Sequence, residues 1–360
     1  MNLKKLILKN FWIYINNSII IIKSKKNTAI KDSPKLYFGG AIAGNSGGPQ
    51  VKVKRLKEFF SSSYINFNLV YCLSNYPYLS KTSLNKIKKN NIPIILNQNG
   101  VYFKGWHPLG WEEKNIQLSR AYNAADYIFW QSEFCKTSAE LFLGKNSGSG
   151  EVLFNAVDTN KFRPFVISNS SEFTFLVTGK FKKSLFYRLK GSVESFYLCQ
   201  QKNKDIHLKI VGFMDKELKN KILDLVNSLG ISRKVTIMGS YSQNNAPEIY
   251  NSADAYLMLK YMDASPNVVI EAMACGLPIV YSSTVGVPEL VGSEAGIGLI
   301  QKESWSIEPH HPNPELVSEA MNRVIIQRNA FSAAARKRAV AQFNIDNWVG
   351  RHRKVFDAYI

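Results

Sequence analysis

The chain has 360 residues, of which 45% are hydrophobic and 20% are charged, and its formal net charge at pH 7 is +19. This composition excludes an intrinsically disordered protein, and the length favours two domains over one. The four cysteines stand far apart in the sequence, at Cys72, Cys135, Cys199 and Cys275. Their scatter disfavours a disulfide framework and a zinc site, so a reducing cytoplasm is the simplest location.

The positive charge is concentrated in the amino-terminal half. Residues 1–165 carry 23 Lys and Arg against 9 Asp and Glu, a net charge of +14, whereas the rest of the chain has a net charge of +5. Such a surface favours anionic partners: a membrane at the inner cell surface, a phosphate-bearing acceptor or nucleic acid. Ordinary solubility explains the excess at least as well.

Residues 1–34 form an extension before the first predicted strand. Their apolar run is broken by three asparagines and is too short to span a bilayer. Lysines follow the run where a secretory signal would need a small-residue cleavage site. Two alternatives stay open: an interfacial anchor at a membrane surface, or a plain extension that packs on the first domain.

From Lys35 onward, short apolar segments alternate with amphipathic ones. Strands are predicted over 35–42, 65–73, 92–98, 126–132 and 151–157, and helices over 51–60, 84–90, 112–125 and 136–144. A strand-helix alternation indicates a doubly wound parallel sheet. The alternation restarts at 173, after a segment rich in Pro, Ser and Asn over 159–172 that is typical of an interdomain linker. The predicted fold is therefore α/β, with two doubly wound Rossmann-like domains over 35–165 and 172–342 and an amphipathic helix over 343–360.

Glycine-rich and polar loops follow the strands of the first domain. The turn after the first strand contains Gly39, Gly40, Gly47 and Gly48, which let the backbone approach a ligand closely but match neither a P-loop nor the dinucleotide fingerprint. Further candidates at the same edge of the sheet, for contacts with an acceptor, are Asn97, Asn99 and His107. A lone loop histidine is more often structural than catalytic.

The stretch from Tyr261 to Glu289 contains a helix that is apolar on every side except at Glu271. A helix that is apolar all round is a buried one, so Glu271 is predicted to be a buried carboxylate. Ser265 is the predicted N-cap, with Pro266 at the first helical position. A buried carboxylate needs a cation, a set of hydrogen-bond donors or a ligand.

The same stretch is an acidic island in a basic chain. Between Lys260 and Lys302 the chain has no Lys or Arg, but it has four acids: Asp263, Glu271, Glu289 and Glu294. Carboxylates repel phosphate and accept hydrogen bonds from hydroxyls, so a ribose or a hexose is a suitable ligand. A distant Lys or Arg that pairs with Glu271 is an equally weighted alternative.

The segment ASPNVVIEAMACGLPIV, with VGVPEL after it, resembles the donor-site signature of the retaining glycosyltransferases of family 4. That signature has two glutamates separated by seven residues, and Asp263 and Glu271 hold these positions here, with Asp in place of the first Glu. The resemblance extends more weakly over residues 36–358. It implies a GT-B fold, in which the terminal helix over 343–360 packs back on the amino-terminal domain.

The resemblance also implies a reaction: a glycosyl group passes from a nucleoside diphosphate sugar to an acceptor hydroxyl with retention of configuration. Glu271 would hold the ribose and Asp263 the sugar, and the diphosphate charge would be stabilised by cations from the basic loop over 180–191. The candidate cations are Lys180, Arg188 and Lys190, and His107 is a further catalytic candidate. The remaining donor-site candidates are Ser265, Pro266, Asn267, Val268, Gly239, Tyr241 and Glu289. No Asp-x-Asp triplet occurs in the sequence, so neither a metal nor another cofactor is expected.

Two alternatives come from other functional classes. The same fold suits a nucleotide-sugar epimerase or hydrolase, and the basic charge suits a non-enzymatic binder of polyanions. The residues do not identify the base, the sugar or the acceptor, which is a glycan, a lipid-linked molecule or a small molecule. No specific nucleic acid partner is expected.

Overall fold

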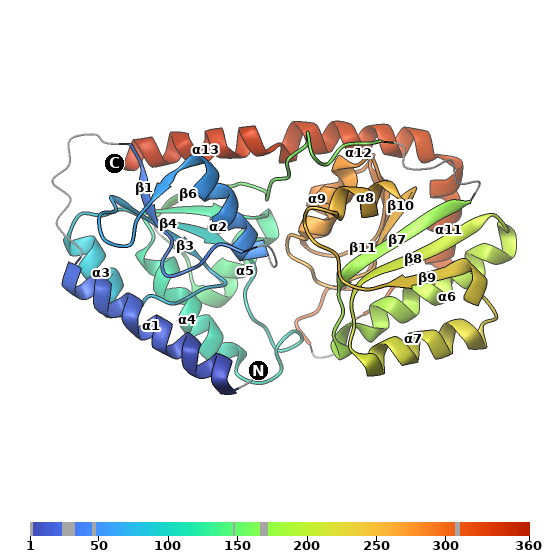
Figure 1. Ribbon diagram of the computed structural model, residues 1–360, viewed down its shortest axis with the longest axis horizontal. Helices are drawn as coiled ribbons and strands as arrows, with labels where there is room; N and C mark the ends of the chain where they lie inside the picture. Colours follow the sequence, from blue (N-terminus) through green and yellow to red (C-terminus); the bar gives the residue numbers. More distant parts are fainter. Residues whose placement is uncertain (1–2, 24–32, 45–47, 147, 166–171, 307–309) are drawn as a thin grey trace. The chain divides into compact units, whose positions relative to one another are not determined.

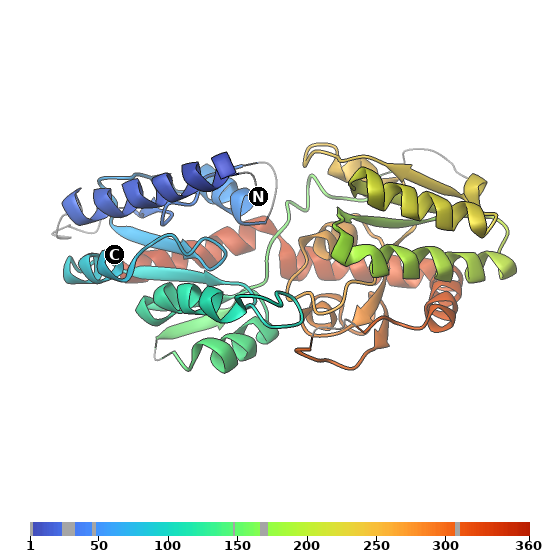
Figure 2. The same cartoon turned by 90° about the horizontal axis from the view of Figure 1, so that it is seen from below.

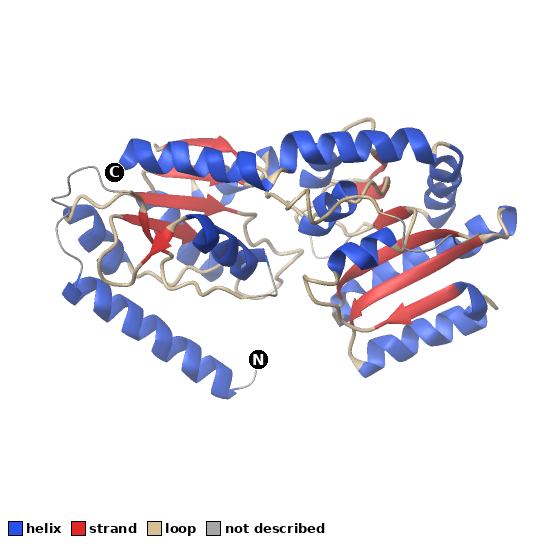
Figure 3. Cartoon of the chain, turned by 45° about the horizontal axis from the view of Figure 1, so that its top comes forward, coloured by secondary structure: helices blue, strands red, loops and turns tan. Residues whose placement is uncertain are grey.

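The computed structural model describes residues 3–23, 33–44, 48–146, 148–165, 172–306 and 310–360, and it divides into two compact units (Figure 1). Unit 1 comprises Met1–Phe154 together with Asp346–Ile360, and unit 2 comprises Asn155–Ile345. Each unit contains a six-stranded sheet in which every strand pair is parallel, with helices packed against it (Figure 3). The predicted α/β fold with two doubly wound sheets is confirmed.

The sheet of unit 1 has the strand order β2-β1-β3-β4-β5-β6. Its strands are β1 (Lys35–Tyr37), β2 (Ser61–Ser62), β3 (Leu69–Leu73), β4 (Ile94–Gln98), β5 (Tyr127–Trp130) and β6 (Ser149–Val152). Its helices are α1 (Leu3–Lys23), α2 (Gly48–Phe59), α3 (Lys81–Lys89), α4 (Trp111–Ala124), α5 (Glu133–Leu143) and nearly all of α13 (Ile345–Tyr359). Every residue of β3 and β4 is buried, and both strands are apolar except for Asn97 and Gln98 at the carboxyl end of β4.

Helix α1 lies along the outside of unit 1 (Figure 2). Its Trp12 indole donates to the carbonyl of Gly40 at 2.9 Å, and the Asn17 amide donates to the carbonyl of Tyr78 at 2.9 Å. Residues 3–23 of the extension therefore pack on the first unit as a regular helix. None of the helices in the described ranges is both long and apolar enough to cross a membrane.

Helix α13 packs on the sheet of unit 1 through a buried histidine. The Nδ1 of His352 donates to the carbonyl of Trp348 at 2.8 Å, so its Nε2 accepts from the Tyr71 hydroxyl at 2.9 Å. Burial lowers the pKa of His352 to about 3. The imidazole is therefore neutral at physiological pH, and both of its nitrogens are satisfied.

The sheet of unit 2 has the strand order β12-β11-β10-β7-β8-β9. Its strands are β7 (Phe173–Lys180), β8 (Ile206–Phe213), β9 (Val235–Met238), β10 (Ala255–Met258), β11 (Ile279–Ser283) and β12 (Gly296–Ile300). Its helices are α6 (Phe186–Lys202), α7 (Lys216–Ser228), α8 (Ala246–Asn251), α9 (Asn267–Ala274), α10 (Gly286–Val291), α11 (Pro314–Ile326) and α12 (Arg328–Phe343). Because all six strands are parallel, their carboxyl ends meet at one edge, where ligand-binding loops of such sheets lie.

Candidate functional site

Glu271 is the buried carboxylate that the sequence predicts. It lies in α9 with an exposed fraction of 7%. One carboxylate oxygen accepts from the side-chain amide of Gln243 at 2.9 Å, and the other accepts from the Tyr250 hydroxyl at 2.9 Å. Gln243 follows β9 and Tyr250 lies in α8, so two neighbouring segments supply neutral donors to one acid. Each carboxylate oxygen has two lone pairs, so it can accept more than one hydrogen bond.

The amino terminus of α9 differs from the prediction. Its N-cap is Pro266 and not Ser265, and no side chain makes a capping hydrogen bond. The Ser265 hydroxyl instead accepts from the side-chain amide of Asn155 at 3.3 Å. The first amides of the helix, at Asn267 and Val268, therefore lack a side-chain cap, and the helix dipole makes this end attractive to an anion.

Three tyrosines surround Glu271 and the end of β7. Burial, and secondarily the Glu271 charge, raises the pKa of Tyr250 well above its ordinary value. Burial raises the pKa of Tyr241 to about 12, with Tyr256 and Glu271 adding to the shift. The Tyr256 hydroxyl donates to the carbonyl of Thr178 at 3.2 Å. The hydroxyls of Tyr241 and Tyr250 consequently stay protonated at physiological pH and serve as hydrogen-bond donors.

Arg188 lies at the other end of this tyrosine cluster. It is 4% exposed, and its guanidinium lies 5.5 Å from the Phe181 ring centre. Its Nη2 donates to the Tyr256 hydroxyl at 3.3 Å and to the Leu257 carbonyl at 3.4 Å, both long, and its Nε has no partner among the described residues. No carboxylate of the described chain forms an ion pair with it within 4.0 Å. A buried cation in this state is suited to accept an anion.

The basic segment over 180–191 is only partly a loop. Helix α6 begins at Phe186, so Arg188 and Lys190 are helical. Lys190 is half exposed and pairs with Glu194, one turn further on, at 3.6 Å. Lys180 ends β7 and is exposed, with its ammonium 5.7 Å from the Phe213 ring centre. Of the three predicted cations, Arg188 is thus the one that contacts the tyrosines beside Glu271, through the Tyr256 hydroxyl.

Asp263 lies in the loop after β10 and pairs with Lys260 at 2.7 Å. The preceding Met262 has a φ of 52°, a left-handed conformation that costs a non-glycine residue about 1 kcal/mol. Gly286 packs closely against this loop. A Cβ at position 286 would lie 1.8 Å from the carbonyl oxygen of Ala264, so only glycine fits there. Gly286, which follows β11, thus packs directly on the backbone of this loop. The carboxylate of Asp263 is already paired with the ammonium of Lys260.

Two other predicted donor residues lie on neighbouring segments. Gly239 directly follows β9 and faces open space. Glu289 lies in the first turn of α10, where its backbone carbonyl accepts from Arg338 at 2.7 Å. Both follow strands at the carboxyl edge of the unit 2 sheet.

The glycine turn of unit 1 packs against α1. Gly39 and Gly40 have φ values of 60° and 86°, which favour glycine, and a Cβ on Gly40 would lie 3.2 Å from the Asn16 side chain. Gly48 begins α2. The predicted ligand contact at Gly47 lies outside the described residues.

The polar candidates of unit 1 divide into buried and accessible ones. Asn97 is 1% exposed, and its carbonyl oxygen accepts from the side-chain amide of Gln131 at 2.7 Å. The Asn99 carbonyl oxygen accepts from the Gly100 amide at 2.8 Å. His107 is partly exposed and lies edge-on to Tyr102, with ring centres 5.6 Å apart.

Lys52 is a candidate that the sequence analysis did not find. It lies in α2 with an exposed fraction of 8%, and its ammonium donates to the Asn97 carbonyl oxygen. Burial, and to a lesser extent Arg55, lowers its pKa to about 7. The signal in the sequence is a lysine four positions before the buried Leu56, on the apolar stripe of the helix. It places a titratable cation at the carboxyl edge of the unit 1 sheet.

We expect Lys52→Met to stabilise the protein at neutral pH. The folded-state pKa of Lys52, about 7, lies below its ordinary value of 10.5, so the unfolded chain binds more protons between these values. The stability of the native protein therefore rises with pH in this window, by at most about 1.4 kcal/mol per pH unit from this group. Calorimetry should show a higher Tm for the variant at pH 7, with a difference that shrinks toward pH 10. A Tm difference that does not depend on pH would contradict a lowered pKa for Lys52 in the folded protein.

The sequence of unit 2 matches a known family. The model of the glycosyl transferases group 1 family matches residues 158–340, just over half of the chain. The chain belongs to this family. The predicted family likeness is thereby confirmed, and the matched segment contains Arg188, Tyr241, Asp263, Glu271 and Glu289.

Two curated relatives of this group 1 family member are similar to part of the chain. An uncharacterized glycosyltransferase of Methanocaldococcus jannaschii is 28% identical over 118 residues, which cover 32% of this chain and 28% of the relative. A D-inositol 3-phosphate glycosyltransferase of Mycobacteroides abscessus is 26% identical over 113 residues, which cover 31% of this chain and 24% of the relative. The chain thus spans less than a third of the length of either relative.

Solved structures share the fold of the group 1 family member over most of its length. Anabaena HepE in complex with UDP has a TM-score of 0.65 at 14% identity, and the match covers 86% of this chain and 82% of HepE. Sucrose-phosphate synthase from Thermosynechococcus elongatus has a TM-score of 0.63 at 16% identity, covering 97% and 94% of the two chains. These likenesses extend the GT-B assignment to both units.

Proposed function

We propose that the protein is a retaining glycosyltransferase that moves a sugar from a nucleoside diphosphate sugar to an acceptor hydroxyl. The observation that carries the proposal is Glu271: a buried carboxylate held by a neutral amide and a neutral phenol at the carboxyl edge of the unit 2 sheet. Both of these donors are neutral, so neither cancels the negative charge of the carboxylate, and a charged acceptor strengthens hydrogen bonds from ligand hydroxyls. Membership of the group 1 family supports the same conclusion.

The donor would bind across the loops of unit 2. Glu271 would accept hydrogen bonds from the ribose hydroxyls. Asp263 would accept hydrogen bonds from the sugar hydroxyls while it keeps its ion pair with Lys260. Gly239 and Tyr241 follow β9 and would flank the base. Ser265, just before α9, and Glu289, in the first turn of α10, would be further donor contacts. The structures of Anabaena HepE hold UDP and UDP-glucose, which makes UDP sugars the first donors to test.

The diphosphate is the leaving group, and its charge grows as the glycosidic bond breaks. Arg188 has an unused Nε donor and long hydrogen bonds, so it can turn toward a phosphate at little cost. The uncapped amides of Asn267 and Val268 would add the dipole of α9, and Lys180 and Lys190 would contribute more distant positive charge. These groups bind and stabilise the leaving group with protein cations and amides.

The acceptor side is proposed for unit 1. Lys52 of α2 contacts Asn97 near the carboxyl end of β4. Asn99 and His107 follow that strand, and the glycine turn at Gly39 follows β1 at the same edge. A lysine with a pKa of about 7 exists in both charge states near neutrality, so it can bind an anionic group of the acceptor or hold a hydroxyl.

A panel of UDP, GDP and ADP sugars tests the proposal on the full chain. We expect one nucleotide sugar to raise the Tm, because a ligand that binds only the folded state stabilises it in proportion to occupancy. With hydroxyl acceptors added, nucleoside diphosphate should be released, and proton NMR should show the donor's anomeric configuration in the product. Free sugar released at the same rate without an acceptor would indicate a hydrolase, and no response to any donor would contradict the proposal.

A further inference from the structure

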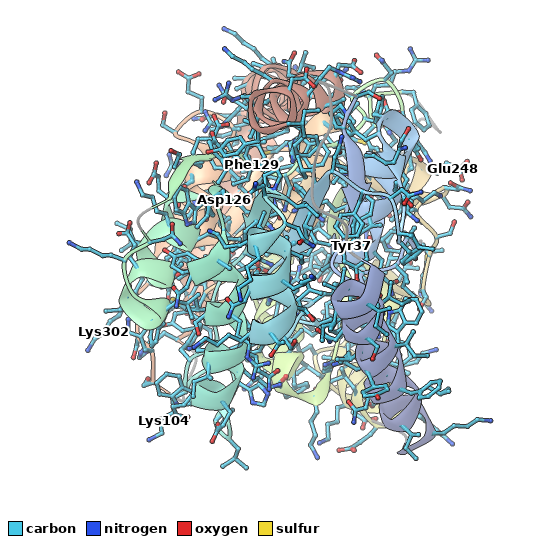
Figure 4. The ribbon with its side chains drawn as sticks, turned by 90° about the vertical axis from the view of Figure 1, so that its left-hand side faces the viewer. Tyr37, Lys104, Asp126, Phe129, Glu248 and Lys302 are labelled. Carbon is cyan, nitrogen blue, oxygen red and sulfur yellow. The ribbon has the colours of Figure 1, made fainter. Side chains whose placement is uncertain are left out.

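Helix α1 packs one face on unit 1 and exposes a second face that is apolar. The inner face follows Trp12, Asn16 and Ile20, of which Asn16 and Ile20 are 1% and 0% exposed. The outer face carries large apolar side chains whose exposed fractions run from 45% to 76%: Ile7, Leu8, Phe11, Tyr14, Ile21 and Ile22. Figure 4 looks at unit 1 from the side on which α1 lies and shows its side chains projecting from the helix. An apolar stripe of this length on a protein surface marks an interaction site.

The inner face holds α1 firmly in place. The Tyr37 hydroxyl donates to the Asn16 carbonyl oxygen at 3.0 Å. The Asn17 carbonyl oxygen accepts from the Ser80 amide at 2.8 Å and from the Ser83 hydroxyl at 2.6 Å. These bonds fix both the position and the rotation of the helix. In this structure the outer face is therefore the one that faces away from unit 1.

The charge around this face is positive. Helix α1 contains four lysines and no acid, and α3, which lies beside it, also contains four lysines and no acid. Of the α3 lysines, Lys88 pairs with Asp126, while Lys81 and Lys89 are exposed. The ammonium of Lys9 on α1 lies 5.5 Å from the Tyr78 ring centre. Apolar side chains on a helix pair that carries lysines and no acid are complementary to an anionic lipid surface.

We propose that α1 and α3 bind the surface of an anionic lipid bilayer, with the outer face of α1 inserted among the headgroups. A second copy of the chain is the competing occupant of an apolar face. A symmetric dimer would place this face against itself and bring its lysines together without any acid to offset them. Anionic lipid removes that repulsion. The proposal does not depend on the glycosyltransferase activity.

The test is sedimentation of the full chain with lipid vesicles. We expect binding to phosphatidylcholine vesicles with about 30% phosphatidylglycerol to exceed binding to pure phosphatidylcholine at least tenfold, and to weaken between about 0.1 M and 0.5 M salt. The double variant Phe11→Ser, Ile22→Ser should lose about tenfold or more of this binding by removing buried apolar area. The double variant Lys9→Glu, Lys89→Glu should bind the anionic vesicles more weakly, and its binding to pure phosphatidylcholine vesicles should not change.

Ile326→Ser is the matched control, because Ile326 is 81% exposed but lies at the end of α11 in unit 2. It should bind vesicles as the unaltered protein does. Circular dichroism and the Tm verify that each variant is folded. Equal vesicle binding by the serine double variant and the unaltered protein would overturn the proposal. It would also be overturned if the unaltered protein ignored vesicles and light scattering showed a dimer that the serine double variant separates.

Discussion

Glu271→Gln should reduce kcat/KM for the nucleotide sugar about a hundredfold, equivalent to about 2.7 kcal/mol of transition-state stabilisation. The change removes the charge of the buried carboxylate and keeps its shape. Hydrogen bonds from ligand hydroxyls to a charged acceptor are worth about 1.5–3 kcal/mol, roughly twice those to a neutral amide oxygen. Steady-state kinetics with a saturating acceptor measures the loss.

The fold should survive this substitution. Gln243 can turn its amide to present oxygen to the new NH₂ group, and Tyr250 keeps an oxygen to donate to, so the Tm should fall by only a few degrees. Glu294→Gln is the matched control, since it makes the same chemical change at an exposed acid 23 positions later in the sequence. If Glu271→Gln keeps the kcat/KM of the unaltered protein, Glu271 has no role in donor binding.

Arg188→Met should weaken the binding of free UDP between about tenfold and a hundredfold, the value of one charge-assisted bond to phosphate. The stability of the ligand-free protein should stay the same or rise. The reason is that Arg188 is buried with long hydrogen bonds and an unpartnered Nε, so methionine removes a desolvated charge and fills similar space. Calorimetric titration and a thermal scan report the two effects separately.

A structural role for Arg188 would give the opposite pattern. If the guanidinium compensated a buried charge, its removal would lower the free energy of unfolding by about 3–5 kcal/mol. A variant that still folded would then bind UDP normally. Lys202→Met is the control on the same helix, because Lys202 is exposed at its last turn. Arg188→Lys should recover part of the affinity, since lysine keeps the charge but loses the two-pronged geometry.

The sequence was sufficient for the architecture and for the principal acid. Apolar runs such as that of β4 alternate with amphipathic helices, and this pattern is local, so it predicts two parallel sheets. The burial of Glu271 follows in the same way, because its neighbours in α9 are apolar on every side. Both features depend on residues that are adjacent in the chain.

The partners of these residues depend on the tertiary structure and could not be predicted. Gln243 and Tyr250 reach Glu271 from another loop and another helix, and the Ser265 hydroxyl is engaged by Asn155, 110 positions earlier. The basic segment was predicted to be a loop because its lysines dominate it. Its second half continues the apolar stripe of α6, and this places Arg188 inside the core while Lys190 points outward.

The amide hydrogen exchange of the full chain with and without UDP tests the central claim most directly. We predict slower exchange on UDP binding in three segments that follow strands of unit 2: residues 180–190, 239–245 and 259–271. Exchange in α11 and α12 should not change. Protection confined to unit 1, or bound UDP without protection at 259–271, would contradict a donor site built around Glu271.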